Sequence, residues 1–244
     1  MTATRALPIG ANLATVVLLP GMDGSGALSA EFVAAMQLSD LPTVVSYPPD
    51  RAWGYQELEA FVQEQLPTDR PYVLIAESFS GPIAIALAAR NPAGLAALVL
   101  VCTFVRCPIR MPKQFARAAL YLPIGPVTTA IGVRYVVGSF STPTLRTQIR
   151  EAVSRVTSAT WRSRLRAVVD VDVSDAMRQV RVPVLYLRAA RDRVVPRSSS
   201  EAVARCCPNA RIVEIDGPHF LLLAKPQECA AAVREFASEA GLTN

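Results

Sequence analysis

The sequence predicts an α/β domain in which helices cover both faces of a mostly parallel sheet. Short apolar runs rich in β-branched residues alternate with helical patterns, which is the order of parallel strands and their crossover helices. The 244 residues are 51% hydrophobic and 18% charged, with a mean hydropathy of +0.29. This composition excludes a disordered or fibrous chain. The apolar runs are far shorter than the ~20 residues of a membrane-spanning helix, so we expect no stable membrane insertion.

The first half of the chain contains four predicted strands and three predicted helices. The first strand ends at Pro20-Gly21, the second at Pro48-Pro49, and the alanine-rich third helix at Asn91-Pro92. The second helix is predicted from its amphipathic spacing. In order, the elements are strand Thr15–Leu19, helix Ser29–Met36, strand Thr43–Ser46, helix Tyr55–Leu66, strand Tyr72–Ala76, helix Ile83–Arg90 and strand Ala97–Val101.

The alternation breaks between Cys102 and about Val180, where prolines separate short helical segments and no clear strand recurs. It resumes with strand Val184–Leu187, helix Ser199–Cys206, strand Arg211–Ile215 and helix Pro226–Ala240. We therefore expect a single domain with a core of about six parallel strands, formed by residues 1–102 and 181–244, and an inserted helical lid at residues 103–180. Residues Ala6–Leu13 could add one short edge strand to this sheet.

The basic residues gather in the predicted lid. Between Phe104 and Val169 the chain has eleven basic residues and one acidic residue, which gives +10 in a protein of net charge +5. Aromatic residues are not interleaved with these arginines as base stacking would require, so we expect no nucleic-acid partner. Two interpretations stay open: a solvated helical surface, or a surface that recruits an acidic protein or an anionic substrate.

The five cysteines are odd in number and have neither CxxC nor metal-ligand spacing. Free thiols in a reducing compartment fit this pattern best, so we expect a cytoplasmic protein. No phosphate loop, dinucleotide fingerprint or metal motif occurs in the sequence, so we expect no cofactor and no metal.

The segment Ala76-Glu77-Ser78-Phe79-Ser80-Gly81 lies where a predicted strand turns into a predicted helix. A nucleophile elbow requires small residues two positions before and after the nucleophile, because its strained backbone brings those positions close together. Ala76 and Ser80 stand where the usual G-x-S-x-G pattern has glycines, so Ser78 has the nucleophile position. The alternative is a serine in an ordinary strand–helix turn.

His219 favours a catalytic role for Ser78. It is the only histidine in the chain and lies in the loop after the last predicted strand, so any imidazole that activates Ser78 must be this one. The carboxylate that orients it is expected one strand earlier, and Asp192 lies there between two arginines that we expect to keep it ionised. The competing acids Asp170, Asp172 and Asp175 precede that strand.

Four segments together resemble the lid-bearing α/β-hydrolase superfamily, over the chain from about residue 14 to residue 239. They are Pro20–Gly26, Ala76–Gly81, Asp192–Pro196 and Gly217–Phe220. The resemblance implies a serine esterase of the carboxylesterase type, and the carrier-protein methyl-ester esterases of biotin synthesis are similar. It also implies an oxyanion hole formed by the backbone N–H groups of Met22 and Phe79, although Pro20 replaces the histidine that usually begins the first loop.

The implied mechanism is two-step acyl transfer, in which His219 deprotonates Ser78 and water hydrolyses the acyl-enzyme. A serine at the elbow argues against the dehalogenases of this fold, which use an aspartate. An acyltransferase or a thioesterase would use the same three residues. A non-catalytic ligand receptor on this fold is a third interpretation.

Substrate contacts are expected from the lid. Most of the apolar stretch Leu120–Phe140 should pack within the lid, and a minority should line an acyl pocket above Ser78. The candidates are Tyr121, Ile131, Tyr135 and Phe140 for an apolar acyl group, and Arg155 and Arg162 for an anionic or carrier-bound part of the ester.

Overall fold

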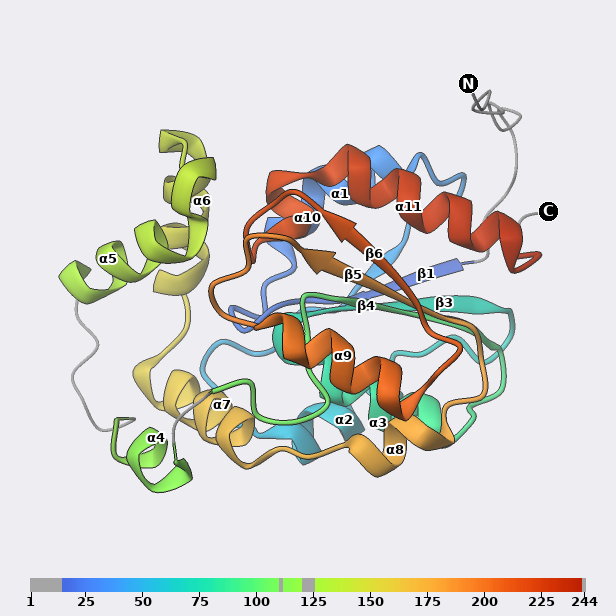
Figure 1. The fold of residues 1–244 in the computed structure, drawn as a ribbon, viewed down its shortest axis with the longest axis horizontal. Coiled ribbons are helices and arrows are strands. Elements are labelled where there is room, and N and C mark those ends of the chain that lie inside the picture. The colour runs from blue at the N-terminus through green and yellow to red at the C-terminus, as the bar shows by residue number, and fades with distance from the viewer. Residues whose placement is uncertain (1–14, 110–111, 120–125, 243–244) are drawn as a thin grey trace.

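The computed structural model describes residues 15–109, 112–119 and 126–242 (Figure 1). Six parallel strands form one sheet in the order β2-β1-β3-β4-β5-β6. They are β1 (Thr15–Leu19), β2 (Thr43–Val44), β3 (Tyr72–Glu77), β4 (Leu95–Val101), β5 (Val184–Ala189) and β6 (Arg211–Ile215). The predicted parallel sheet of about six strands is confirmed, and the expected edge strand at Ala6–Leu13 lies outside the described residues.

Helices cover both faces of the sheet (Figure 1). One face packs against α1 (Ala30–Met36), α10 (Leu221–Ala224) and α11 (Pro226–Glu239). The other packs against α2 (Tyr55–Gln63), α3 (Gly81–Ala89), α8 (Ser174–Gln179) and α9 (Arg197–Cys206). In the described part of the chain, no helix combines the length and the apolar character needed to cross a membrane.

The central strands are apolar without alternation because both of their faces are buried. All six residues of β3 are buried. Val73 and Ile75 pack toward α1 and α11, whereas Leu74 and Ala76 pack toward α2 and α3. Such continuous apolar runs are what made the strands recognisable in the sequence.

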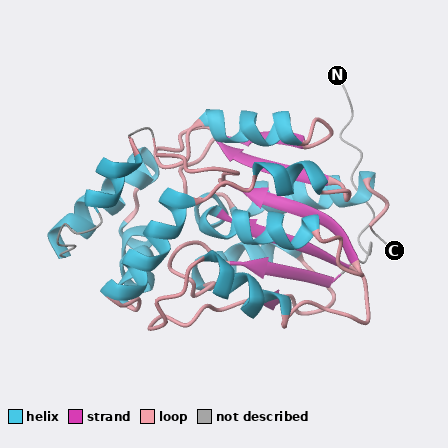
Figure 2. Cartoon of the chain, turned by 90° about the horizontal axis from the view of Figure 1, so that it is seen from below, coloured by secondary structure: helices cyan, strands magenta, loops and turns pink. Residues whose placement is uncertain are grey.

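The insertion between β4 and β5 is helical in its described part. It contains α4 (Lys113–Ala119), α5 (Pro126–Val137), the short 3-10 helix η3 (Gly138–Phe140), α6 (Pro143–Ser154), α7 (Ser158–Asp170) and α8. The side-chain oxygens of Thr142 and Thr157 accept backbone N–H bonds and so cap the beginnings of α6 and α7. Helices α4 to α7 lie beyond the ends toward which the strand arrows point (Figures 1 and 2).

A separate apolar cluster joins the insertion to the core. Val133 and Val137 of α5 and Ile149 of α6 pack against two core residues. These are Leu28 of the 3-10 helix η1 (Ala27–Ser29) and Leu223 of α10. These side chains are buried, so the insertion shares packed apolar surface with the domain. Because parallel strands all end at the same edge, this cluster holds the insertion next to the loops that follow β1, β3, β5 and β6.

Candidate active site

Ser78 occupies a strained turn between β3 and α3. Its φ is +49°, a left-handed conformation that costs a residue other than glycine about 1–3 kcal/mol. Ala76 and Ser80, two positions before and after it, are fully buried. A Cβ on Gly81 would lie 1.9 Å from Oγ1 of Thr103. The backbone is therefore packed so closely here that larger residues would not fit, as a nucleophile elbow requires.

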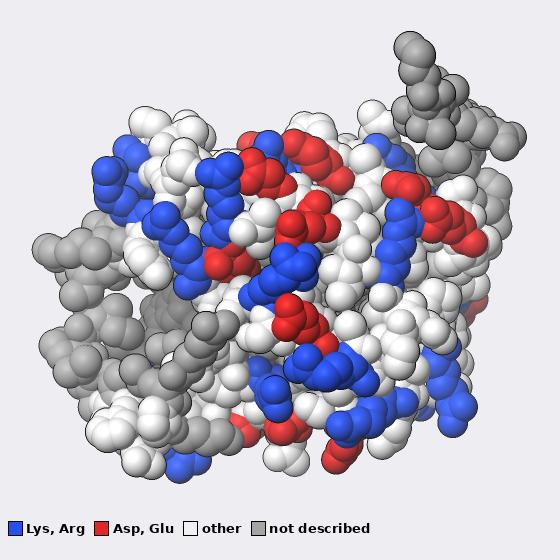
Figure 3. All heavy atoms as spheres, in the orientation of Figure 1, with Lys and Arg blue, Asp and Glu red and all other residues white. Residues whose placement is uncertain are grey.

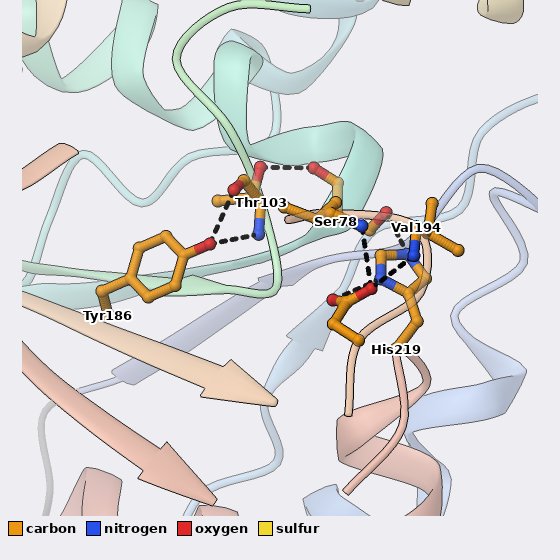
Figure 4. Close-up of polar contacts among 7 residues, drawn as sticks. Ser78, Thr103, Tyr186, Val194 and His219 are labelled. Carbon is orange, nitrogen blue, oxygen red and sulfur yellow. Dashed lines mark hydrogen bonds and ion pairs between the residues drawn. The ribbon is translucent and has the colours of Figure 1, made fainter. Parts of the chain in front are cut away.

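Two residues that the sequence analysis did not identify hold this turn in place (Figure 4). The Tyr186 hydroxyl of β5 donates to the Thr103 carbonyl oxygen at 2.6 Å and accepts from the Thr103 backbone N–H at 3.1 Å. Thr103 Oγ1 in turn donates to the carbonyl oxygen of Ser78. The strained backbone is thus tied to two neighbouring strands. No local motif marks this contact, because it joins residues far apart in the sequence.

The three residues predicted to act together lie in one polar chain (Figure 4). Ser78 Oγ is 2.8 Å from Nε2 of His219, and Nδ1 of His219 is 2.8 Å from Oδ2 of Asp192. The His219 and Asp192 side chains are 9% and 5% exposed. The competing acids bond elsewhere: Asp170 to Arg117, Asp172 to the Ser174 backbone N–H, and Asp175 to Arg178.

Backbone N–H groups hold the Asp192 carboxylate. Its Oδ1 accepts from the N–H groups of Val194 and Val195, both at 2.8 Å. The flanking arginines, expected to keep Asp192 ionised, turn away from it. Arg191 pairs with Asp216 at 2.7 Å, and Arg193 donates to the carbonyl oxygen of Tyr135 at 3.0 Å. An aspartate bonds readily to N–H groups two and three residues ahead, so the turn itself supplies the donors.

A second buried carboxyl group, Glu77, lies near His219. Burial raises the pKa of Glu77 to about 7, although the charge of His219 opposes that shift and Asp23 adds to it. Burial also lowers the pKa of His219, but the charge and hydrogen bond of Asp192 and the charge of Glu77 outweigh it, so this pKa lies above its usual value. The imidazolium form of His219 is thus stabilised by two carboxyl groups.

The loops that carry Met22 and Phe79 leave the sheet side by side. Leu19 of β1 pairs with Ala76 of β3, and each candidate lies three residues beyond its strand partner. Ser80 Oγ donates to the carbonyl oxygen of Pro20 and ties the two loops together. Pro20 therefore takes part through its carbonyl group, which a histidine at this position would also present.

The candidate substrate residues are only partly described. Tyr121 lies outside the described residues, and the side chain of Ile131 in α5 is likewise not described. Tyr135 is 58% exposed with Arg193 above its ring at 5.3 Å, and the Phe140 ring lies 5.6 Å from the guanidinium of Arg191. Arg155 and Arg162 are exposed.

Basic side chains predominate over α6 on the face drawn in Figure 3 and mix with acidic ones over the core helices. One member of the basic segment differs from the expected solvated surface. Arg164 of α7 is buried, because its side chain reaches into the domain rather than into solvent.

One group of side chains within the described residues has metal-ligating atoms close together. Cys102 Sγ, a carboxylate oxygen of Asp192 and a ring nitrogen of His219 lie within 4.8 Å of one another. Two of these residues already belong to the polar chain with Ser78, so a cation there would compete with its hydrogen bonds. All five cysteines are free thiols.

Residues 9–232 match the model of the alpha/beta hydrolase family, so the chain belongs to this family. It is 26% identical to the pyrrolizixenacetamide deacetylase of Xenorhabdus hominickii over 68% of this chain and 65% of that one. It is 27% identical to a pimeloyl-[acyl-carrier protein] methyl ester esterase of Aromatoleum aromaticum over 70% of this chain and 75% of that one. The first of these matches thus spans slightly under two thirds of the relative's length.

Among solved structures, the fold is similar to that of the enol-lactonase from Burkholderia xenovorans LB400. The TM-score is 0.79, and the match covers 93% of this chain and 92% of that one. The sequences are 18% identical, so this likeness concerns the fold alone.

The carboxyl groups around His219 predict the pH dependence of any reaction that uses its neutral form as a base. Because the pKa of His219 lies above its usual ~6.5, kcat/KM should rise with pH through a value above 6.5. Glu77→Gln removes the negative charge that Glu77 carries when it is ionised, so it should move this acidic limb to lower pH. Glu64→Gln, at an exposed carboxylate directly after the end of α2, is the control. A limb that stays in place or moves upward in Glu77→Gln would contradict the electrostatic assignment.

Proposed function

We propose that the protein is a serine hydrolase of carboxylic esters, of the carboxylesterase type. The observation that carries this proposal is the polar chain of two 2.8 Å contacts from Ser78 through His219 to Asp192, which begins on a strained elbow. The similarity to proteins named as a methyl ester esterase and a deacetylase supports it.

In the first step, Ser78 is the nucleophile and His219 is the general base. The Nδ1–H of His219 donates to Asp192, which leaves Nε2 free to accept the proton of Ser78 as Oγ attacks the acyl carbonyl carbon. Asp192 orients the ring and stabilises the imidazolium. The resulting oxyanion accepts hydrogen bonds from the N–H groups of Met22 and Phe79, each worth about 3 kcal/mol in the transition state.

In the second step, the tetrahedral intermediate collapses and the bond to the leaving alcohol breaks. The proton on His219 Nε2 passes to the alkoxide, and the acyl group stays on Ser78. Water then enters, gives a proton to His219 and attacks the acyl carbon. Collapse of this second intermediate returns the proton to Ser78 and releases the carboxylic acid.

The helical insertion, residues 103–180, is proposed as the lid over this site. Its position beyond the carboxyl ends of the strands and its apolar contacts with the core support this role. Of the residues expected to line an apolar acyl pocket, we propose Tyr135 and Phe140, whose side chains the structure describes. The basic excess of the insertion suits an ester that carries an anionic group or is bound to an acidic carrier protein, as in the name of one relative.

Transfer of the acyl group to another acceptor would use the same three residues. Addition of an alcohol or thiol acceptor to a p-nitrophenyl ester assay separates the two reactions. Hydrolysis predicts that release of free acid accounts for all p-nitrophenol formed, whereas an acyltransferase would yield the ester or thioester of the added acceptor instead.

Removal of Ser78 or His219 should abolish turnover of a short-chain aryl ester. Ser78→Ala and His219→Ala should each lose at least 1,000-fold in kcat, because the nucleophile and base act as a unit. Asp192→Asn should also reduce kcat, but the size of its effect is less predictable than for the other two variants, because another acid can sometimes orient the imidazole. Circular dichroism should show an unchanged fold. Retention of more than about a tenth of the wild-type rate in Ser78→Ala or His219→Ala would refute the assignment.

The basic insertion predicts a salt dependence that differs between substrates. The second-order rate constant for an anionic or carrier-protein-bound ester should fall steeply as salt rises, because screening acts over roughly 10 Å at 0.1 M. A neutral p-nitrophenyl ester of the same acyl length should hardly respond. Charge reversal by Arg155→Glu and Arg162→Glu should flatten the first dependence and leave the neutral ester unaffected. Equal salt slopes for both substrates would show that the arginines form only a solvated surface.

A further inference from the structure

Arg164 of α7 is a charged side chain enclosed within the domain. It is 1% exposed, although it comes from an insertion whose other basic side chains in α6 and α7 are mostly exposed. Burial lowers its pKa because desolvation disfavours the charged form, and the nearby Tyr47 and Asp23 oppose that shift. A buried guanidinium is stable only where acceptors replace the water that it has lost.

The acceptors are backbone carbonyl groups of two core loops. Nη1 of Arg164 donates to the Met22 carbonyl oxygen at 2.7 Å, and Nη2 donates to that of Pro48 at 3.1 Å. The guanidinium carbon also lies 5.7 Å from the centre of the Tyr47 ring. The planar fork thus connects α7 with the loop that follows β1 and the loop that follows β2.

The loop after β1 has a shape that accommodates this guanidinium. A Cβ on Gly24 would lie only 2.8 Å from Nη1 of Arg164 and 3.0 Å from Cβ of Tyr47. Gly24 also has a φ of +74°, which favours glycine. Both the space and the conformation at this position therefore depend on the absence of a side chain.

Hydrogen bonds fix the peptide groups on both sides of Met22. The Gly21 carbonyl oxygen accepts from the N–H of Gly24 at 3.0 Å. Because Gly21 C=O and Met22 N–H share one planar peptide group, this bond sets the direction of the Met22 N–H. The next carbonyl group along the chain, that of Met22, is the one held by Arg164.

A second path leads from Arg164 to the elbow. The Tyr47 hydroxyl is 2.7 Å from Oγ of Ser80, which donates to the carbonyl oxygen of Pro20. The ring that lies beside Arg164 is therefore bonded to the residue two positions after Ser78. The loop of Met22 and the turn of Ser78 are both braced by groups that contact Arg164.

We propose that Arg164 is a positioning residue for the oxyanion hole. Arg164 holds the loop that contains Met22, so that the Met22 N–H points toward the reacting carbonyl oxygen. This inference rests on the proposed ester hydrolysis, in which Met22 is an oxyanion donor. Arg164 does not touch substrate. It acts through the Met22 carbonyl group and through Tyr47, and it makes the geometry of the hole depend on the placement of α7.

The test compares Arg164→Met and Arg164→Lys with Arg205→Met, which removes an exposed arginine of α9. The assays are kcat and KM for a neutral aryl ester, and the affinity for an aryl trifluoromethyl ketone, whose adduct with Ser78 places an oxyanion in the hole. Arg164→Met should lower kcat about 10- to 100-fold with KM within about twofold, and should weaken ketone binding by a similar factor. The values for Arg164→Lys should fall between those of Arg164→Met and the wild type, because one ammonium group cannot reproduce both hydrogen bonds of the planar guanidinium. Arg205→Met should match the wild type.

Thermal unfolding and circular dichroism establish which variants are folded. A folded Arg164→Met with kcat and ketone affinity within twofold of wild type would overturn the inference, as would a change confined to KM. If Arg164→Met does not fold, the same criteria apply to Arg164→Lys. A wild-type protein that neither hydrolyses esters nor binds the ketone would refute the proposed function, and this inference with it, before any variant is measured.

Discussion

The left-handed backbone of Ser78 is the constraint on which the rest of the site depends. A φ of +49° at a serine persists only where its surroundings leave no alternative, and here those surroundings are the sheet itself. β3 fixes the chain before the turn. Thr103, which follows β4, donates to the Ser78 carbonyl oxygen, and the Tyr186 hydroxyl of β5 holds the Thr103 backbone. The absent side chain at Gly81 makes room for Thr103. The turn places Oγ of Ser78 at the carboxyl edge of the strands, where the loops of Asp192 and His219 also end.

Two buried charged side chains near this turn, Asp192 and Arg164, are held by backbone groups. Asp192 accepts two backbone N–H bonds and one bond from His219, and Arg164 donates to two backbone carbonyl groups. Each of these groups would be costly to bury alone. Backbone groups in these loops move little, so they keep the side chains bonded to them in nearly fixed positions. Such a network is sensitive to substitution, because removal of one partner leaves another buried polar group without a hydrogen bond.

The fold and the polar chain were predictable from the sequence because their signals are local. Apolar runs at β3, β4 and β5 reported strands buried on both faces, and the single histidine left only one partner for Ser78. The brace formed by Thr103 and Tyr186 and the burial of Arg164 were not predictable, because both depend on contacts between residues more than 80 positions apart. For the same reason the sequence suggested that the arginines beside Asp192 hold its charge, whereas the folded turn supplies backbone N–H groups.

The most direct measurement of whether Ser78 is an activated nucleophile is covalent labelling by a fluorophosphonate, followed by mass spectrometry of the intact protein and its peptides. The account predicts one phosphonyl group per folded chain, located on the peptide that contains Ser78, and no labelling of protein unfolded in guanidinium chloride. Unfolding separates Ser78 from His219 and Asp192, so it removes the activation while the serine itself remains. Absence of labelling in the folded protein, or a label on a different residue, would contradict the account.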